Sequence, residues 1–189
     1  MSSTSPATDT STLTGSYTID PAHSRIGFVA RHAMVTKVRG SFKEFEGSGF
    51  FDADDPTKSK LNLTITAASI DTGNADRDGH LRSNDFFSMD QYPQITFVST
   101  GVERTGDDRY RVTGDLTLKG VTKPVSVEFE HTGAAVDPFG NHRVGFEGST
   151  TVNRKDWGIT WNAPLEAGGV LVGEKVVLEF DVSAIRTGD

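Results

Sequence analysis

Apolar side chains recur at every second position in seven stretches of this 189-residue chain, and this alternation constrains the fold more than any other feature. Ile26, Phe28 and Ala30 share one face of the stretch SRIGFVARH. Arg25 and Arg31 share the other face. Successive side chains of a strand point to opposite faces, so the alternation predicts half-buried antiparallel strands. The motifs TGDD, LKGVTKP and DPFGN separate these stretches and favour short hairpin connections, which makes the chain all-β.

The region RGSFKEFEGSGFFD supplies a further bent strand or hairpin and brings the expected number of strands to eight or nine. Phe42 and Phe45 are three residues apart, which puts them out of register for one regular strand. A bulge near Lys43 or Glu44 would return both phenyl groups to the same face. We therefore expect an irregular strand at this point.

The alternation leaves the nature of the interior open. Strands of about ten residues reach ~30 Å, and a closed sheet of about eight strands has an interior that side chains fill or that holds one small ligand. A sandwich is also compatible with the pattern. Gly114, Gly148 and Ala30 are interspersed among mid-sized inward positions, which leaves room for a tunnel. A filled core and a tunnel stay equal alternatives on the pattern alone.

The connection from Asp71 to Pro93 is the one long connection between the predicted strands. Loops of this length in a compact domain are usually functional. Asn74 is a candidate N-cap for a short helix, and a second turn is expected near Ser83 or Asn84. Pro93 favours extended geometry in the preceding residue, where the next strand begins. We predict a short helical segment within residues 71–93 that closes one end of the sheet.

Charge and composition exclude several classes of partner. The net charge is −7 and the pI is about 5.2, whereas a nucleic-acid-binding protein usually carries a basic face, so no nucleic-acid partner is expected. The chain has no cysteine, which excludes disulfides and thiolate metal sites. No stretch approaches the ~20 apolar residues of a membrane span, so stable membrane insertion is not expected.

The N-terminal stretch MSSTSPATDTSTLTG is rich in Ser and Thr and has neither a basic region nor an apolar run. It therefore does not resemble a secretory signal, and the interpretation is a cytoplasmic protein. We expect residues 1–16 to form a disordered tail, because they have almost nothing to bury. Residues 17–189 are expected to form a single domain.

The familiar catalytic motifs are absent, and the polar candidates have structural interpretations. Asp20, His23 and Ser24 could form an acid–base pair with a nucleophile. Their spacing also suits a turn at the start of a strand, which Asp20 caps and His23 stabilises by a hydrogen bond, and this interpretation is favoured. A zinc site from His23, His32 and His80 is conceivable but disfavoured, because no pair has a close ligand spacing on one element, and no metal is predicted.

Six segments in order resemble the YceI-like family of bacterial polyisoprenoid-binding proteins. They are YTIDPAHSRIGFVARH, GSFKEFEG, SIDTGNADRDGHLRSNDFF, YPQITF, VTGDLTLKGVTKPV and VNRKDWGI. The resemblance covers essentially residues 17–185. It implies an extended eight-stranded antiparallel lipocalin-like barrel whose hydrophobic tunnel holds a long-chain amphipathic lipid. It also implies no catalytic residues and no cofactor apart from the bound lipid.

The predicted function is therefore non-catalytic binding, transport or storage of an isoprenoid lipid. A polyprenyl quinone, a polyprenyl pyrophosphate and a fatty-acid-like molecule are the candidate ligands, and a homodimer is expected. The tunnel lining is predicted to be Ile26, Phe28, Ala30, Phe42, Leu63, Ile65, Ile95, Phe97, Leu116, Val127, Phe129, Phe146, Trp157, Leu178 and Phe180. The residues predicted at the mouth, facing a polar head group, are His23, His32, Arg77, Asp78, His80, Arg82 and Arg154.

Two alternatives remain beside this function. One is an enzyme that acts on a small apolar substrate in the same cavity, using Asp20, His23, Ser24, Asp78 and His80. The other is an interaction module with a filled core. The three hypotheses differ in whether the barrel has an interior cavity and in whether the polar residues reach it.

Overall fold

The computed structural model describes residues 13–33, 35–162, 165 and 172–188, and within them the chain forms one antiparallel sheet of eleven strand segments. The strands are β1 Gly15–Ile19, β2 Arg25–His32, β3 Thr36–Phe42, β4 Phe45–Phe51, β5 Lys60–Thr66, β6 Ile70–Asp71, β7 Gln94–Gly106, β8 Arg109–Leu118, β9 Val121–Val136, β10 His142–Asn153 and β11 Val172–Gly188. The helices are η2 Pro21–His23, η3 Pro56–Lys58, η4 Ala67–Ser69, α1 Ala75–Arg82 and η5 Arg154–Trp157.

The sheet closes into an eight-stranded barrel. Its order is β1, β4, β5, β7, β8, β9, β10 and β11, and pairing of β1 with β11 completes the ring. Strand β11 is 17 residues long, so it pairs with β1 near its end and with β2 near its start. Segments β2, β3 and β6 therefore extend β1, β4 and β5 along the barrel, and the predicted antiparallel barrel is confirmed.

Three neighbouring strands are interrupted at the same level of the barrel. Helix η2 separates β1 from β2, Lys43 and Glu44 separate β3 from β4, and η4 separates β5 from β6. Phe42 and Phe45 are both buried on either side of the second break, which confirms the predicted irregularity. Each break lets a strand change direction without turning its apolar face away from the interior.

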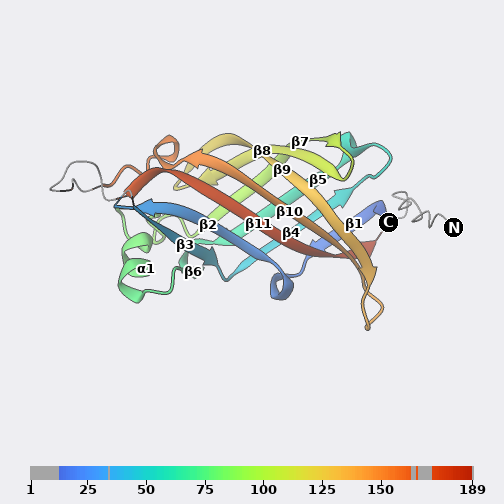
Figure 1. The fold of residues 1–189 in the computed structure, drawn as a ribbon, viewed down its shortest axis with the longest axis horizontal. Helices are drawn as coiled ribbons and strands as arrows, with labels where there is room; N and C mark the ends of the chain where they lie inside the picture. The colour runs from blue at the N-terminus through green and yellow to red at the C-terminus, as the bar shows by residue number, and fades with distance from the viewer. Residues whose placement is uncertain (1–12, 34, 163–164, 166–171, 189) are drawn as a thin grey trace.

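The barrel has two different ends (Figure 1). We call one the α1 end, because α1 lies there together with η5, the β2–β3 turn and the β8–β9 turn. We call the other the termini end, because β1 begins and β11 finishes there. The β4–β5, β7–β8 and β9–β10 connections also lie at the termini end.

Helix α1 forms where the sequence predicts it. The Asn74 side chain accepts a hydrogen bond from the Arg77 backbone N–H at 3.0 Å and caps the helix. Turns follow from residue 84, and β7 begins directly after Pro93. The short helical segment in the long connection is therefore confirmed. Among the described residues, no helix has the length and apolar character needed to cross a membrane.

Inward glycines provide space for phenyl rings on the adjacent strands. A Cβ on Gly114 would lie 2.5 Å from the Phe97 ring, and a Cβ on Gly148 would lie 2.7 Å from the Phe129 ring. Both are closer than carbon atoms approach in proteins, so neither glycine could become alanine without moving its neighbour. The expectation that these glycines leave empty room is wrong at these two positions, because the rings already occupy the space.

The barrel begins earlier than the sequence indicates. Strand β1 starts at Gly15, and Leu13 is buried against Tyr17. The Tyr17 hydroxyl donates a 2.7 Å hydrogen bond to the Leu13 carbonyl. The predicted tail of residues 1–16 is therefore wrong for residues 13–16, and residues 1–12 lie outside the described part of the chain.

Candidate functional site

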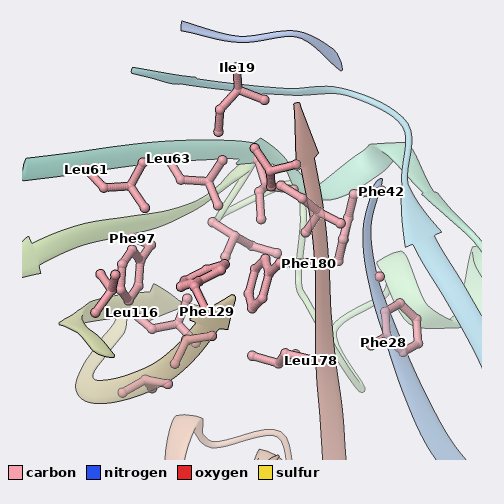
Figure 2. Close-up of a pocket in the computed structure, with 18 of the residues that line it drawn as sticks. Ile19, Phe28, Phe42, Leu61, Leu63, Phe97, Leu116, Phe129, Leu178 and Phe180 are labelled. Atoms are coloured by element: carbon pink, nitrogen blue, oxygen red, sulfur yellow. The ribbon is translucent and has the colours of Figure 1, made fainter. Parts of the chain in front are cut away.

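A cavity of about 300 Å³ lies inside the barrel. Side chains from several strands point into it, including Leu63 on β5, its neighbour Phe97 on β7, and Phe180 on β11 (Figure 2). The lining runs from Trp157 at the α1 end to Tyr17 at the termini end, so the cavity extends along the barrel. Its volume falls at the lower end of the ~300–1,000 Å³ typical of small-molecule sites.

All fifteen residues predicted to line a tunnel do line this cavity. Several of them are only half-buried, because their inner surfaces border empty space and not other side chains: Phe28, Ala30, Leu116, Phe129, Phe146, Leu178 and Phe180. The alternative of a filled core is therefore wrong. Contact of these residues with a ligand stays a prediction.

The sequence analysis omitted other lining residues. Tyr110 and Val112 share the alternation of Leu116 on β8, so periodicity could have identified them. Ile159 follows η5 outside any strand and had no such signal. The omitted residues also include Tyr17, Ile19, Leu61, Leu81, Phe86, Phe87, Val102, Leu118, Val125, Val144, Val152, Val172, Val176, Val182 and Ala184.

An aromatic cluster lies at the α1 end. The His80 ring on α1 lies 4.5 Å from the Trp161 ring and 5.0 Å from the Phe86 ring, centroid to centroid. The Phe86 and Trp161 rings are 5.4 Å apart. His80 Nε2 donates to the Asp85 carboxylate at 2.9 Å, which orients the imidazole. These contacts join the long connection to the segment after η5.

Three of the predicted mouth residues hold the long connection in place. Asp78 is buried and accepts hydrogen bonds from the backbone N–H and hydroxyl of Thr72. Arg77 donates to the Thr72 hydroxyl and carbonyl, both at 2.7 Å. Arg82 donates to the carbonyls of Ala68 and Ile70 at 2.9 and 3.1 Å. The structure thus gives these charged groups partners within the chain.

Arg154 borders the cavity but is likewise held by the backbone. It is buried, and its guanidinium donates to four carbonyl oxygens: Gly173 at 2.9 Å, Ile159 at 2.8 Å, Trp161 at 3.0 Å and Val172 at 3.2 Å. Burial lowers the pKa of this guanidinium from its ordinary value. Arg154 therefore joins η5 and the following segment to the start of β11.

The first histidine candidates lie away from the cavity. His23 is exposed on η2, and its Nδ1 donates to the Asp20 carboxylate at 2.7 Å, as the predicted turn requires. The Ser24 hydroxyl donates to the Ser183 carbonyl and accepts from its N–H. His32 is exposed at the end of β2. Asp20, His23, Ser24 and His32 do not line the cavity, and in the described part of the chain no three His, Asp or Glu side chains gather as metal ligands would.

Comparison with known proteins identifies the family. Residues 17–184 match the YceI-like domain. A UPF0312 protein of Photorhabdus laumondii subsp. laumondii is 46% identical over 149 residues, which cover 78% of this chain and 77% of the relative. Protein YceI of Escherichia coli is 44% identical over 151 residues, covering 79% and 78%.

Solved structures have the same fold. BcnA of Burkholderia cenocepacia superposes with a TM-score of 0.77 at 26% identity, covering 87% of this chain and 98% of that one. A polyisoprenoid binding domain from Saccharophagus degradans superposes with a TM-score of 0.66, covering 90% and 98%, and its 15% identity supports the fold alone. With an eight-stranded barrel, an apolar interior and a family match over nearly all of its length, the chain belongs to the YceI-like family.

Proposed function

We propose that the protein binds a long-chain isoprenoid lipid in its barrel without catalysing a reaction. The observation that carries this proposal is the cavity, whose lining is almost entirely aliphatic and aromatic. Arg154 and Lys60 are the only charged residues among the described lining, and the Arg154 guanidinium is already bound to carbonyls. A hydrocarbon chain is the ligand that such a wall accepts.

The energetics favour a long chain over a small polar substrate. Each methylene moved out of water contributes about 0.8 kcal/mol. Ordering of the flexible chain opposes this gain, so affinity does not follow from contact area alone. Because backbone pairing closes the eight strands into a ring, the wall needs little rearrangement when the ligand enters.

The assignment to isoprenoids rests on the resemblance of the sequence to the polyisoprenoid-binding YceI-like family, to which the chain belongs. The Saccharophagus degradans domain, described as polyisoprenoid binding, shows that the same fold occurs in a protein with that description. A polyprenyl quinone and a polyprenyl pyrophosphate are the leading candidates. A role in transport or storage, a homodimer and a cytoplasmic location stay predictions of the sequence.

The enzyme alternative has less support. Its residues Asp20, His23 and Ser24 lie outside the cavity lining, while Asp78 and His80 have partners on neighbouring residues. No group of the described lining resembles a nucleophile with an adjacent base. Binding is therefore the function that the geometry favours.

Native mass spectrometry of the gently purified full chain tests the proposal. We expect either a co-purified lipid mass or uptake of an added polyprenyl quinone in a 1:1 complex. Ligand binding to the native state should also raise the unfolding midpoint with lipid concentration. A protein that stays empty against quinones, prenyl alcohols, prenyl pyrophosphates and fatty acids would contradict the proposal.

A further inference from the structure

The two ends of the cavity differ in the hydrogen-bonding groups that they leave available. At the α1 end, Arg77, Arg82 and Arg154 donate to groups of their own chain. At the termini end, two inward polar groups have no such partner among the residues that the structure describes. They belong to His131 on β9 and Tyr110 on β8.

His131 is the first of these groups. Val127 and Phe129 precede it on the inner face of β9 and line the cavity, so the period of two points His131 inward as well. Its side chain is only 6% exposed. Nε2 is buried and has no hydrogen-bond partner among the described residues, and Nδ1 lies 3.8 Å from the Asp108 carboxylate, beyond hydrogen-bond distance.

Tyr110 is the second group. It is 5% exposed and lines the cavity, and its hydroxyl makes no hydrogen bond within the described part of the chain. The hydroxyl of Tyr17, at the same end, is already bound to the Leu13 carbonyl. Burial raises the pKa of Tyr110, so its hydroxyl stays a neutral donor at physiological pH.

The two groups lie close to each other. Tyr110 faces Phe129 across the β8–β9 pairing, which makes it a diagonal neighbour of His131 on the inner face. Both rings also pack on Phe146, at 5.2 Å for His131 and 6.3 Å for Tyr110. Tyr110 and Phe146 line the cavity, and His131 is not part of the lining but packs on the Phe146 ring.

A buried nitrogen without a partner is costly, and native structures rarely keep one. On the basis of the proposed function, we infer that the polar head group of the bound lipid lies at the termini end and hydrogen-bonds to His131 and Tyr110. This places the head group at the opposite end from the one predicted from the sequence, where α1 lies.

The same geometry selects the class of head group. The Asp108 carboxylate lies 3.8 Å from His131 Nδ1, and Arg104 forms an ion pair with Asp107 in the same turn. Two cations of this end lie on other strands: Lys60 at the start of β5 lines the cavity, and Arg186 of β11 pairs with Tyr17. A neutral hydroxyl or quinone carbonyl could instead use both hydrogen-bonding groups. Because the two groups lie beside a carboxylate, we expect a neutral isoprenoid, and a pyrophosphate held by the cations of this end is the competing outcome of the test.

Three probes of similar chain length separate head-group recognition from chain binding. Geranylgeraniol has a hydroxyl, geranylgeranyl pyrophosphate has a charged head and phytane has none. We expect geranylgeraniol to displace a hydrophobic dye from the wild-type protein at a concentration at least about tenfold lower than the pyrophosphate does. Equal or tighter binding of the pyrophosphate would overturn the inference.

Variants locate the head group. His131→Phe and Tyr110→Phe should each weaken geranylgeraniol binding about fivefold, the value of one neutral hydrogen bond, and leave phytane binding unchanged. His142→Phe makes the same substitution at an exposed histidine of β10 and is the matched control. Tyr110→Phe removes only one oxygen, so it provides the test should His131→Phe fail to fold.

The outcomes distinguish this inference from the proposed function. Unchanged geranylgeraniol binding in Tyr110→Phe, together with a His131→Phe effect no larger than that of His142→Phe, would place the head group elsewhere. Binding of phytane in that case would still support a lipid-binding barrel. If the wild-type protein binds none of the three probes, the proposed function itself is wrong.

Discussion

Arg154 shows how a charge at the cavity wall can have a structural role. Its guanidinium is planar and carries five N–H donors, which suits it to several acceptors at once. Four carbonyls use these donors: those of Ile159 and Trp161 in the segment after η5, and those of Val172 and Gly173 at the start of β11. Without the guanidinium, these carbonyls would lose a donor where water has little access, although the Val172 carbonyl would still accept from the Asn162 amide, at 2.7 Å.

Arg154→Met should therefore destabilise the fold by about 2–4 kcal/mol, because it leaves buried acceptors unsatisfied. Denaturant unfolding of the lipid-free protein measures this loss. Lys155→Met is the control, since Lys155 forms a half-exposed ion pair with Glu174 at 2.7 Å and should change stability by less than about 1 kcal/mol. If Arg154→Met kept its stability and lost only lipid affinity, the guanidinium would be a head-group ligand instead.

Single residues differ in how far the sequence predicts their roles. The Asp20–His23 turn follows from local spacing, because both partners lie within four residues. The partners of Arg154 lie up to 19 residues away, and the geometry that gathers them depends on the closed barrel. The position of His131 could not be predicted to matter, because the lack of a hydrogen-bond partner for its Nε2 among the described residues depends on how the neighbouring strands pack.

At the scale of elements, Arg143 joins three parts of the barrel. Located on β10, it donates to Asp137 of the β9–β10 connection and to Asp20 at the start of η2, both at 2.7 Å. These hydrogen bonds lower the pKa of both carboxyl groups from the ordinary value. The break between β1 and β2 is thereby held against the neighbouring hairpin.

The lowered pKa values predict a pH dependence. A carboxyl whose pKa is lower in the folded state adds stability above its unfolded pKa, about 4, and loses that contribution as the pH falls. Arg143→Gln should therefore lower the unfolding midpoint at pH 7, and the difference from the wild type should shrink below about pH 4. Thermal unfolding at several pH values checks this expectation. Arg104→Gln, at an exposed pair with Asp107, should show no such convergence.

The alternation in the sequence predicts the strands well, because one buried face imposes a period of two. The break at Lys43 and Glu44 was also predictable, since it shifts the period between Phe42 and Phe45. The alignment of this break with η2 and η4 was not, because it depends on which strands become neighbours. Sequence periodicity describes each strand alone, whereas the alignment of the breaks depends on how neighbouring strands are paired.

At the scale of the whole molecule, the cavity depends on the balance between large and small inward side chains. Phenyl rings project inward from many strands. Inward glycines leave room for some of these rings, as Gly148 does for Phe129. The remaining space forms one cavity, which is lined from Trp157 at the α1 end to Tyr17 at the termini end. One larger side chain at mid-length should therefore divide the cavity without unfolding the protein.

Leu178→Trp tests this balance. Leu178 lies opposite Phe28 on the inner face of β11 and is only half-buried, so an indole can enter the cavity with a stability change within about 1.5 kcal/mol. Binding of a long polyprenyl quinone should weaken at least about tenfold, because part of its chain stays in water at about 0.8 kcal/mol per methylene. A short prenyl alcohol should lose less.

Val177→Trp provides the comparison on the same strand. Val177 pairs with Val29 and points to the outside of the barrel, so its substitution should leave the binding of both ligands unchanged. If Leu178→Trp unfolded while Val177→Trp remained folded, the interior would be too tightly packed to admit an indole, and a hydrocarbon chain could not enter there either. If Leu178→Trp folded and still bound the long quinone as tightly as the wild type, the ligand would have to lie outside the barrel, since the two groups cannot occupy the same space.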